Sequence, residues 1–326
     1  MIEVLDISRK SPGKKVIDLK FVKRLNNTDL YETHANTNLL TYRRLKKKGS
    51  RKGENPACAV FYEYTLNTIR GVCDGICRGC TIGRLLVYKP YFEKNACVYW
   101  RSALKKLKLS RSDGNPMHIY VQSAVDLFLP SMPDYVIYEI LEKLCEYPNF
   151  YYFVTKYPHR FLKFYDEGKI PPRSMVGITT ESDHVVRYKK DDAWIYYTQA
   201  PGNINRLLAA KEINLRGINA FLSIAPFFIP DNLENFISMI IETGIQKVTL
   251  CANQNPYMDD ELQSQLVTSP YLIRDLVDEL GKHDVVSFIN RKSAGVWHLE
   301  YSETPQKPVF ILWSDKEQHE QCFKLK

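Results

Sequence analysis

Short apolar runs alternate with longer amphipathic segments after Pro56, and this alternation limits the fold more than any other feature of the sequence. The expected strands are Ala59 to Tyr64, Met117 to Gln122, Phe150 to Thr155, Met175 to Thr179, Ala220 to Ile224, Lys247 to Cys251 and Val285 to Ile289. The expected helices are Ala96 to Leu109, Asp134 to Tyr147, Asn203 to Arg216, Asp231 to Thr243 and Asp259 to Gly281. Strands separated by such helices predict βαβ units and a parallel sheet. Periodicity alone does not choose between a barrel and a doubly wound sheet.

Polar residues follow nearly every expected strand. In both candidate folds, functional residues collect at the carboxyl ends of parallel strands. The residues there are a cysteine loop after the first strand, then Ser123 and Asp126, Lys156, Thr179 with Thr180 and Glu181, Ser223 with Pro226, and Cys251 with Asn253. Loops of this kind also carry polar residues that only cap helices. Any single residue is therefore as readily structural as functional, but together the six strand ends predict a pocket.

Three of the chain's 8 cysteines, Cys73, Cys77 and Cys80, fall within one short segment. Disulfide frameworks are typical of much smaller, exported chains. The N-terminus has early acidic residues and no apolar core of a signal peptide, and no apolar run has the length of a membrane helix. We therefore expect a soluble, cytoplasmic protein with reduced thiols.

The cysteine segment reads Val72-Cys-Asp-Gly-Ile-Cys-Arg-Gly-Cys-Thr81, a CxxxCxxC spacing. Its two glycines allow a tight fold, and nearby arginines favour thiolates, the form that binds metal. Three close thiolates suit an iron-sulfur cluster with one iron left open. The alternative is a structural zinc site, which needs a fourth ligand such as Cys58 or Cys97.

This loop resembles that of the radical S-adenosylmethionine (SAM) superfamily. The resemblance implies a partial (β/α)6-type TIM barrel in which the three cysteines hold a 4Fe-4S cluster and the fourth iron binds SAM. It further implies reductive cleavage of SAM to a 5′-deoxyadenosyl radical that abstracts hydrogen from a substrate, with a reductant such as flavodoxin or ferredoxin. The barrel would span residues 57–290, preceded by a basic extension over 1–56 and followed by a C-terminal extension over 291–326 packed on it.

Four collinear segments narrow the resemblance to the spore photoproduct lyase branch and to a phage-associated radical SAM family of unknown function. They are SAVDLF from Ser123, TKYPHR from Thr155, VGITTES from Val176 and the stretch Gly217 to Pro226. By this resemblance Lys156 contacts the methionine carboxylate of SAM, a charge-assisted contact. Ser123 and Asp126 line the cofactor site. Thr179, Glu181 and Ser223 contact the ribose or the methionine.

Two positions depart from the pattern of these families. Gly79 stands where an aromatic residue usually precedes the last cysteine, so this position supplies no aromatic contact for the adenine. Ser123 stands where the lyase has the cysteine that returns a hydrogen atom to the product radical. A serine O–H bond is far stronger than a thiol S–H bond, so repair by the lyase route is disfavoured. Cys251 is a candidate replacement donor, although free cysteine more often behaves as a small core residue.

The positive charge of the chain lies in its first 56 residues. The segment Met1 to Pro56 holds 14 Lys and Arg against 6 Asp and Glu, so the net charge of +8 resides there, and the densest stretch is Arg43 to Lys52. This segment is either a solvated arm or a phosphate-binding arm. The second reading favours a nucleic acid or nucleotide substrate, and it also allows an alternative function, a non-catalytic, metal-stabilised nucleic-acid-binding protein. Tyrosine interleaved with cations from Arg187 to Lys190 suits base stacking, although such rings more often fill cores.

Overall fold

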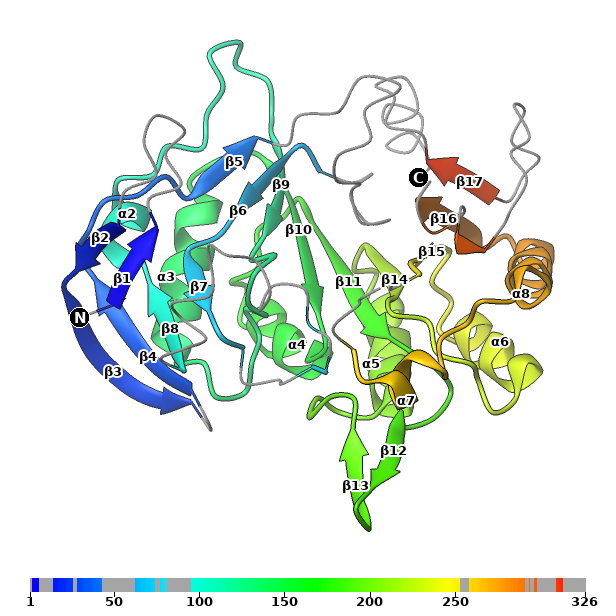
Figure 1. Ribbon diagram of the computed structural model, residues 1–326. Coiled ribbons are helices and arrows are strands. Elements are labelled where there is room, and N and C mark those ends of the chain that lie inside the picture. The colour runs from blue at the N-terminus through cyan, green and yellow to red at the C-terminus, as the bar shows by residue number, and fades with distance from the viewer. Residues whose placement is uncertain are drawn as a thin grey trace. The chain divides into compact units, whose positions relative to one another are not determined.

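The computed structural model describes residues 2–5, 14–25, 28–42, 62–73, 77, 78, 80, 95–252, 258–290, 293, 296, 297 and 309–312. The chain divides into two compact units (Figure 1). Unit 1 comprises Met1–Arg43, Glu63–Phe153 and Arg160–Ser174, and unit 2 comprises Arg44–Tyr62, Val154–His159 and Met175–Lys326. One boundary falls within the strand at Phe150–Thr155, so the two units share a continuous element of chain.

Unit 1 contains three sets of strands. The strands β1 (Ile2–Leu5) and β2 (Lys14–Ile17) form an antiparallel pair. A four-stranded sheet has the order β3-β4-β8-β7, with β3 at Leu19–Leu25, β4 at Thr28–Thr33, β7 at Ile69–Gly71 and β8 at Ala96–Tyr99. The parallel strands β10 (Phe150–Thr155), β9 (His118–Val121) and β6 (Tyr64–Leu66) are adjacent, and β5 (Leu40–Tyr42) adds to β6 in the antiparallel direction.

The helices of unit 1 cover a core that is rich in aromatic residues. They are α2 (Arg101–Lys105), α3 (Asp134–Cys145) and α4 (Pro158–Asp166). Phe128 packs edge-on against Phe153 and Phe161 at ring-centroid distances of 5.6 and 5.3 Å. Such geometry adds stability beyond the burial of apolar area. The loop after β9 is thereby attached to β10 and α4 in the core of unit 1.

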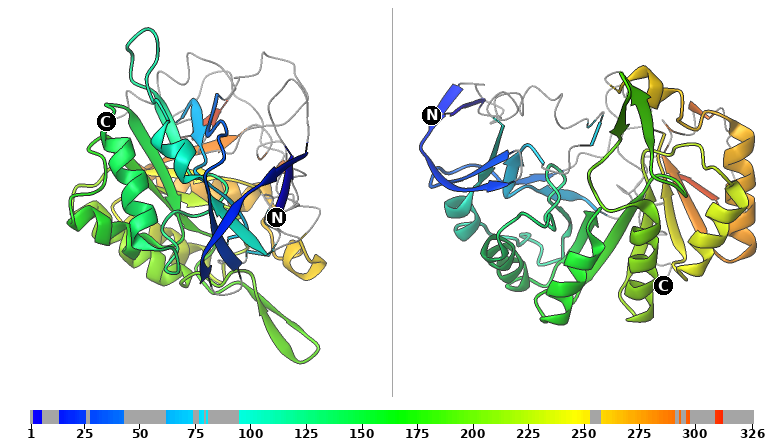
Figure 2. Two further views of the ribbon diagram at one scale, coloured as in Figure 1. Left: turned by 90° about the vertical axis from the view of Figure 1, so that its left-hand side faces the viewer. Right: turned by 90° about the horizontal axis from the view of Figure 1, so that it is seen from below.

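Unit 2 is a parallel sheet with helices between its strands. Its strand order is β17-β16-β15-β14-β11, with β11 at Ser174–Thr180, β14 at Ala220–Ile224, β15 at Lys247–Leu250, β16 at Val286–Asn290 and β17 at Val309–Leu312. The helices are α5 (Asn203–Leu215), α6 (Leu233–Glu242), α7 (Asp260–Gln263) and α8 (Pro270–Lys282). In the right-hand view of Figure 2, α5, α6 and α8 lie along one face of these strands.

A two-stranded hairpin projects from unit 2 between β11 and α5 (Figures 1 and 2). It consists of β12 (Arg187–Lys190) and β13 (Ala193–Tyr196). Asp191 and Asp192 have φ angles of 47° and 63°. Two consecutive positive φ angles are the signature of the type I′ turn, whose twist matches that of a hairpin. The hairpin is therefore closed by a two-residue turn in which aspartate replaces the usual glycine.

The α/β class and the parallel strands are confirmed, whereas a barrel is not. Within each unit, no pairing among the described strands closes the sheet on itself. Strands form at six of the seven expected positions, and helices α5 and α6 end where Gly217 and Gly244 take the positive φ of 70° that ends a helix. The C-terminal segment contributes β17, which pairs with β16.

Several expected elements were wrong or absent. Residues 96–99 form a buried strand rather than the start of a helix, because they pair with β4 and β7. The first strand lies at Tyr64–Leu66, and β7 follows it before the cysteine segment. The expected helix from Asp259 to Gly281 breaks before Pro270, and α4 was not predicted. Within the basic segment, β3, β4 and β5 pair into unit 1, while its densest stretch, 43–52, lies outside the described residues. Across the described part of the chain, no helix has both the length and the apolarity for crossing a membrane.

Candidate functional site

The cysteine segment leaves β7 at a position that only glycine can occupy. Gly71 has a φ of 132°, and a Cβ built on it would lie 2.2 Å from the backbone oxygen of Ala96. Val72 then donates its N–H to the same oxygen at 3.0 Å. This close approach excludes any side chain at residue 71. The contact with β8 therefore fixes the backbone just before Cys73.

The second half of the segment is a turn between the other two cysteines. The N–H of Cys80 donates to the carbonyl of Cys77 at 3.2 Å. Cys73 and Cys77 are partly exposed and Cys80 is exposed, so a cluster can reach each of them from solvent. The segment thus starts next to a fixed backbone contact and ends in a turn. Its three cysteines form a donor set that fits an iron-sulfur cluster. Residues 74–76 and 79 lie outside the described part, and convergence of the three sulfurs stays a prediction.

The zinc alternative requires a fourth ligand near this segment. Cys97 is fully buried in β8, where it pairs in register with Gly71, two residues before Cys73. Cys58 lies outside the described residues. The alternative therefore stays open.

Residues at the end of β9 bind the short connection between β6 and β7, which precedes the cysteine segment. Gln122 has a φ of 61°, and its side-chain Oε1 accepts the N–H groups of Thr68 at 2.9 Å and of Ile69 at 3.4 Å. The Ser123 hydroxyl donates to Asn67 Oδ1 at 3.2 Å. These bonds join the strand end to the residues between β6 and β7. Sequence reasoning found Ser123 but missed Gln122 and Asn67, because each bonds across more than 50 positions of sequence.

Two polar atoms near this connection are buried without a hydrogen bond. They are Gln122 Nε2 and Thr68 Oγ1, whose residues are 3% and 0% exposed. Asp126, by contrast, accepts the N–H of Phe128 at 3.0 Å, a local hydrogen bond within the loop that follows β9. Gln122 Nε2 and Thr68 Oγ1 are both covered by protein, so they lie in the interior of this connection.

Lys156 and Glu181, both predicted site residues, form an ion pair in unit 2. Lys156 directly follows β10, and Glu181 directly follows β11. The Lys156 ammonium lies 5.0 Å from the centroid of the Tyr197 ring, within the range of a cation–π contact. Its side chain is 16% exposed and that of Glu181 is 1% exposed. The pair therefore presents the lysine, not the glutamate, to solvent.

Arg206 of α5 binds the same carboxylate from the other side. Its Nη2 lies 2.5 Å from Glu181 Oε2 and its Nη1 lies 3.2 Å from Oε1, a forked geometry that suits a carboxylate. Burial raises the pKa of Glu181, but the charges of Arg206 and Lys156 and their hydrogen bonds outweigh burial and hold the pKa below its ordinary value. With two cations and one carboxylate, the cluster carries a net charge of about +1. It is thus suited to a further anion.

Asn203, at the start of α5, completes this network. Its Oδ1 accepts from Thr180 Oγ1 at 3.1 Å, from the N–H of Glu181 at 3.0 Å and from Arg206 Nη2 at 2.7 Å. Its Nδ2 donates to the carbonyl of His184 at 2.6 Å. One buried amide therefore connects the end of β11 to α5. Sequence reasoning had no signal for Asn203 or Arg206, which look like ordinary residues of an amphipathic helix.

Thr179 and Ser223 lie inside strands rather than after them. They are partners in the parallel register of β11 and β14, and they are 7% and 5% exposed. Cys251 directly follows β15 as expected and is partly exposed. Its N–H donates to Ile224 and its sulfur lies 3.8 Å from the Ala252 carbonyl oxygen. The predicted residues of unit 2 thus divide into a paired Lys156 and Glu181, two adjacent hydroxyls and one strand-end thiol.

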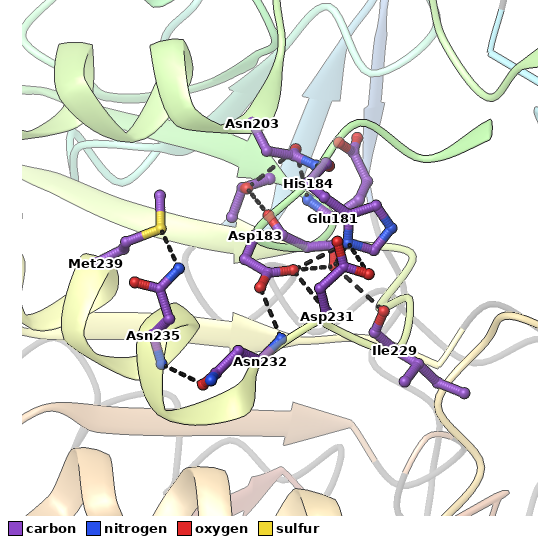
Figure 3. Close-up of polar contacts among 11 residues, drawn as sticks. Glu181, Asp183, His184, Asn203, Ile229, Asp231, Asn232, Asn235 and Met239 are labelled. Atoms are coloured by element: carbon purple, nitrogen blue, oxygen red, sulfur yellow. Dashed lines mark hydrogen bonds and ion pairs between the residues drawn. The ribbon is translucent and has the colours of Figure 1, made fainter.

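A second polar cluster precedes α6 (Figure 3). Asp183 accepts the N–H groups of Asp231 and Asn232 at 2.9 and 3.0 Å, and the Nδ1 of His184 lies 2.9 Å from its Oδ1. Burial raises the pKa of Asp183, but these N–H groups and His184 outweigh it and lower the pKa below its ordinary value. The N-cap of α6 is Asn232, which accepts from the N–H of Asn235, so the helix starts at Leu233 and not at Asp231. Asp183 therefore holds the turn that starts α6.

Asp183, His184 and Asp231 also offer ligand atoms within 4.8 Å of one another, a spacing compatible with a metal ion. Asp231 is 77% exposed, and both oxygens of Asp183 already accept backbone N–H groups. Hydrogen bonds within the cluster thus account for its geometry.

The candidate residues fall in both units. Unit 1 holds the three cysteines, Ser123 and Asp126, and unit 2 holds Lys156, Thr179, Glu181, Ser223 and Cys251.

No family model matches the sequence, and no curated protein matches it. The chain is similar to a structure of a spore photoproduct lyase mutant, with 17% sequence identity and a TM-score of 0.42. The similarity covers 64% of this chain and 59% of that chain, so the matched part spans less than two thirds of that protein.

Proposed function

We propose that this chain is a radical SAM enzyme in which Cys73, Cys77 and Cys80 hold a 4Fe-4S cluster. The CxxxCxxC spacing carries the proposal, supported by a glycine that fixes where the segment begins, a turn at its end and exposed or partly exposed cysteines. Three thiolates leave one iron of a four-iron cluster without a protein ligand. When bound, the cluster supplies the electron that cleaves SAM and so yields the hydrogen-abstracting 5′-deoxyadenosyl radical.

The chain's own contribution in unit 2 is a cationic group for a carboxylate. The side chain of Lys156 is 16% exposed, whereas Glu181 and Arg206 neutralise one another in the interior. Glu181 orients the lysine, and the excess positive charge favours an anionic ligand such as the methionine carboxylate of SAM. Glu181 is thus proposed as a positioning residue, because Arg206 and Lys156 already occupy its oxygens.

The proposed reaction differs from that of the lyase branch at the hydrogen-return step. Ser123 donates its hydroxyl hydrogen to Asn67, and a hydroxyl is a poor hydrogen-atom donor. Cys251, a partly exposed thiol at the end of β15, is the candidate for that role. A nucleic acid or nucleotide remains the proposed substrate class on the strength of the basic N-terminal segment, and a flavodoxin-like or ferredoxin-like protein is the proposed reductant.

Cluster binding tests the proposal. After anaerobic reconstitution, the wild-type protein should hold about four irons and four sulfides per chain, with an absorption band that dithionite bleaches. Alanine at Cys73, Cys77 or Cys80 should abolish this, whereas Cys145→Ala, an exposed cysteine outside the segment, should not. A protein that instead binds one zinc and no iron would contradict the proposal and favour the non-catalytic alternative.

The lysine has a separate test. Lys156→Met should weaken SAM binding to the reconstituted protein by about tenfold or more, because one charge-assisted hydrogen bond is lost. Lys211→Met is the control, since that lysine is half exposed and contacts only Glu242 at 3.8 Å among the ion pairs of the described residues. Isothermal titration with SAM measures both. Equal affinities for the two variants would remove Lys156 from the site.

A further inference from the structure

The hairpin β12–β13 has one face anchored to unit 2 and one face free. In its register Arg187 pairs with Tyr196, Tyr188 with Ile195, and Lys189 with Trp194. Because side chains alternate along a strand, Arg187, Lys189, Trp194 and Tyr196 share one face. Tyr188 and Ile195 share the other.

The Tyr188 face holds the hairpin in place. Tyr188 is 7% exposed, and its hydroxyl donates to Asp259 Oδ2 at 2.7 Å. Gln265 donates from Nε2 to the carbonyl of Arg187 at 3.4 Å, and the N–H of Tyr197 continues the ladder to Val186 at 2.9 Å. The base of the hairpin is thus attached to the α7 region by hydrogen bonds. A short type I′ turn and an anchored base make it a preorganised element.

The opposite face displays only cations and aromatic rings. Trp194 is 51% exposed and Tyr196 is 46% exposed, although large aromatic residues are usually buried. The Arg187 guanidinium lies 4.2 Å from the centroid of the Trp194 ring. No carboxylate among the described residues forms an ion pair with Arg187, and Lys189 contacts only Asp192 of the turn, at 3.0 Å in an exposed pair. Solvent screening makes that pair weak.

We propose that this face binds single-stranded nucleic acid, with bases stacking on Trp194 and Tyr196 and phosphates contacting Arg187 and Lys189. Alternating rings and cations match the alternation of bases and phosphates along a strand. A duplex offers no free base faces within its stack. Protein interfaces share the enrichment in Trp, Tyr and Arg but are depleted in lysine, so Lys189 beside the rings favours a phosphate-bearing strand. The tyrosine singled out in the sequence, Tyr188, is the anchor, and the stacking rings are its neighbours on β13.

This inference goes beyond the proposed chemistry and stands independently of it. The test uses the full chain without SAM or reductant, so loss of cluster chemistry and loss of strand binding are separate results. Fluorescence anisotropy of labelled oligo-dT and oligo-rU of about 12 nucleotides, a length within known site sizes, measures binding to DNA and RNA. Circular dichroism and thermal melting verify that each variant is folded.

Matched pairs of variants separate the contribution of this hairpin face from that of other exposed rings and charges. Trp194→Ala should weaken binding by about fivefold or more, the lower limit for one stacked base. Tyr271→Ala, which removes a 72% exposed ring on α8, should leave affinity unchanged. Arg187→Gln should lower the slope of log affinity against log salt by about 0.7, the value for one single-strand phosphate contact. Lys190→Gln removes the same charge from the opposite face of the hairpin and should leave that slope unchanged.

Three results would overturn the proposal. The first is wild-type protein that binds neither oligonucleotide. The second is Lys190→Gln changing the salt slope as much as Arg187→Gln, since attraction would then be general and not a property of the face. The third is Trp194→Ala losing a co-purifying protein while keeping its oligonucleotide affinity, which would make the face a protein contact.

Discussion

Replacing Arg206 by methionine tests whether the buried ion pair of unit 2 holds β11 and α5 together. Both Arg206 and Glu181 have side chains that are 1% exposed, and the guanidinium contacts both oxygens of the carboxylate. Methionine keeps the unbranched stem but removes every hydrogen bond. Glu181 then retains the ion pair with Lys156, which is nearer to solvent.

Removing one partner of a buried pair costs about 3–5 kcal/mol where the remaining charge is left unpaired, and the ion pair with Lys156 places Arg206→Met at the lower end, about 3 kcal/mol. For a unit of this size, that corresponds to a fall in melting temperature of about 6–12 °C. The double variant Glu181→Leu with Arg206→Met should be more stable than Arg206→Met alone. It removes both fully buried charges and leaves only the Lys156 ammonium, whose side chain is 16% exposed, without its carboxylate partner. Well-packed apolar replacements of such pairs are often neutral.

Chemical denaturation monitored by circular dichroism measures the effect. Arg216→Met is the control: this arginine is the C-cap of the same helix and pairs with Glu212 one turn earlier, but its side chain is 34% exposed. The control should change the free energy of unfolding by about 0.5 kcal/mol or less. If Arg206→Met and Arg216→Met have equal effects, the reasoning about the buried cluster is refuted.

The loss of stability caused by Arg206→Met should also depend on pH. The pKa of Glu181 is held below its ordinary value of 4.5 in the folded state. A depressed carboxyl pKa contributes stability above the unfolded value, and this contribution is lost as the pH falls through the folded pKa. The difference between wild type and Arg206→Met should therefore be constant from neutral pH to about pH 5.5 and should narrow below about 4.5. A difference that grows as the pH falls would contradict the assignment.

Two further predictions concern local anchors. Gly71→Ala should destabilise the chain by about 2 kcal/mol more than Gly114→Ala, because both glycines have positive φ but only at Gly71 would a Cβ clash with backbone. Urea denaturation measures the free energy of unfolding of both variants, and equal values would contradict the clash. Asp183→Ala should cost about 1–3 kcal/mol by leaving two backbone N–H groups unpaired, whereas Asp231→Ala, at an exposed side chain, should cost about 0.5 kcal/mol or less. Thermal melting of both aspartate variants decides this, and a larger effect at Asp231 would show that the exposed carboxylate holds the turn.

The parallel strands were predictable because their runs are mostly apolar. The run at Ala220–Ile224 is buried from its second residue onward, as a covered strand should be. Residues 96–99 were not predictable as a strand, because an apolar run before a polar helical segment fits either a helix or a strand. Pairing with the distant strands β4 and β7 determines which one forms. The hairpin at 187–196 was missed because its turn, Asp191-Asp192, lacks the glycine or asparagine that usually marks a type I′ turn.

Candidate site residues were predictable where they form a motif with a fixed spacing in the sequence. They were not predictable where residues far apart in the sequence come into contact only in the folded chain. The cysteine spacing is visible in the sequence alone. The pairing of Lys156 with Glu181 was not, since each was assigned separately to SAM. Arg206 reaches Glu181 across 25 positions, and its burial, which the sequence does not show, distinguishes it from Arg216 at the C-terminal end of the same helix.

Reductive cleavage of SAM is the most direct test of the central claim. With SAM and dithionite under anaerobic conditions, the reconstituted wild-type protein should form 5′-deoxyadenosine, measured by liquid chromatography and mass spectrometry. The Cys145→Ala variant should form it too, and alanine variants of Cys73, Cys77 and Cys80 should not. Wild-type protein that carries a complete, reducible four-iron cluster yet forms no 5′-deoxyadenosine would contradict the account.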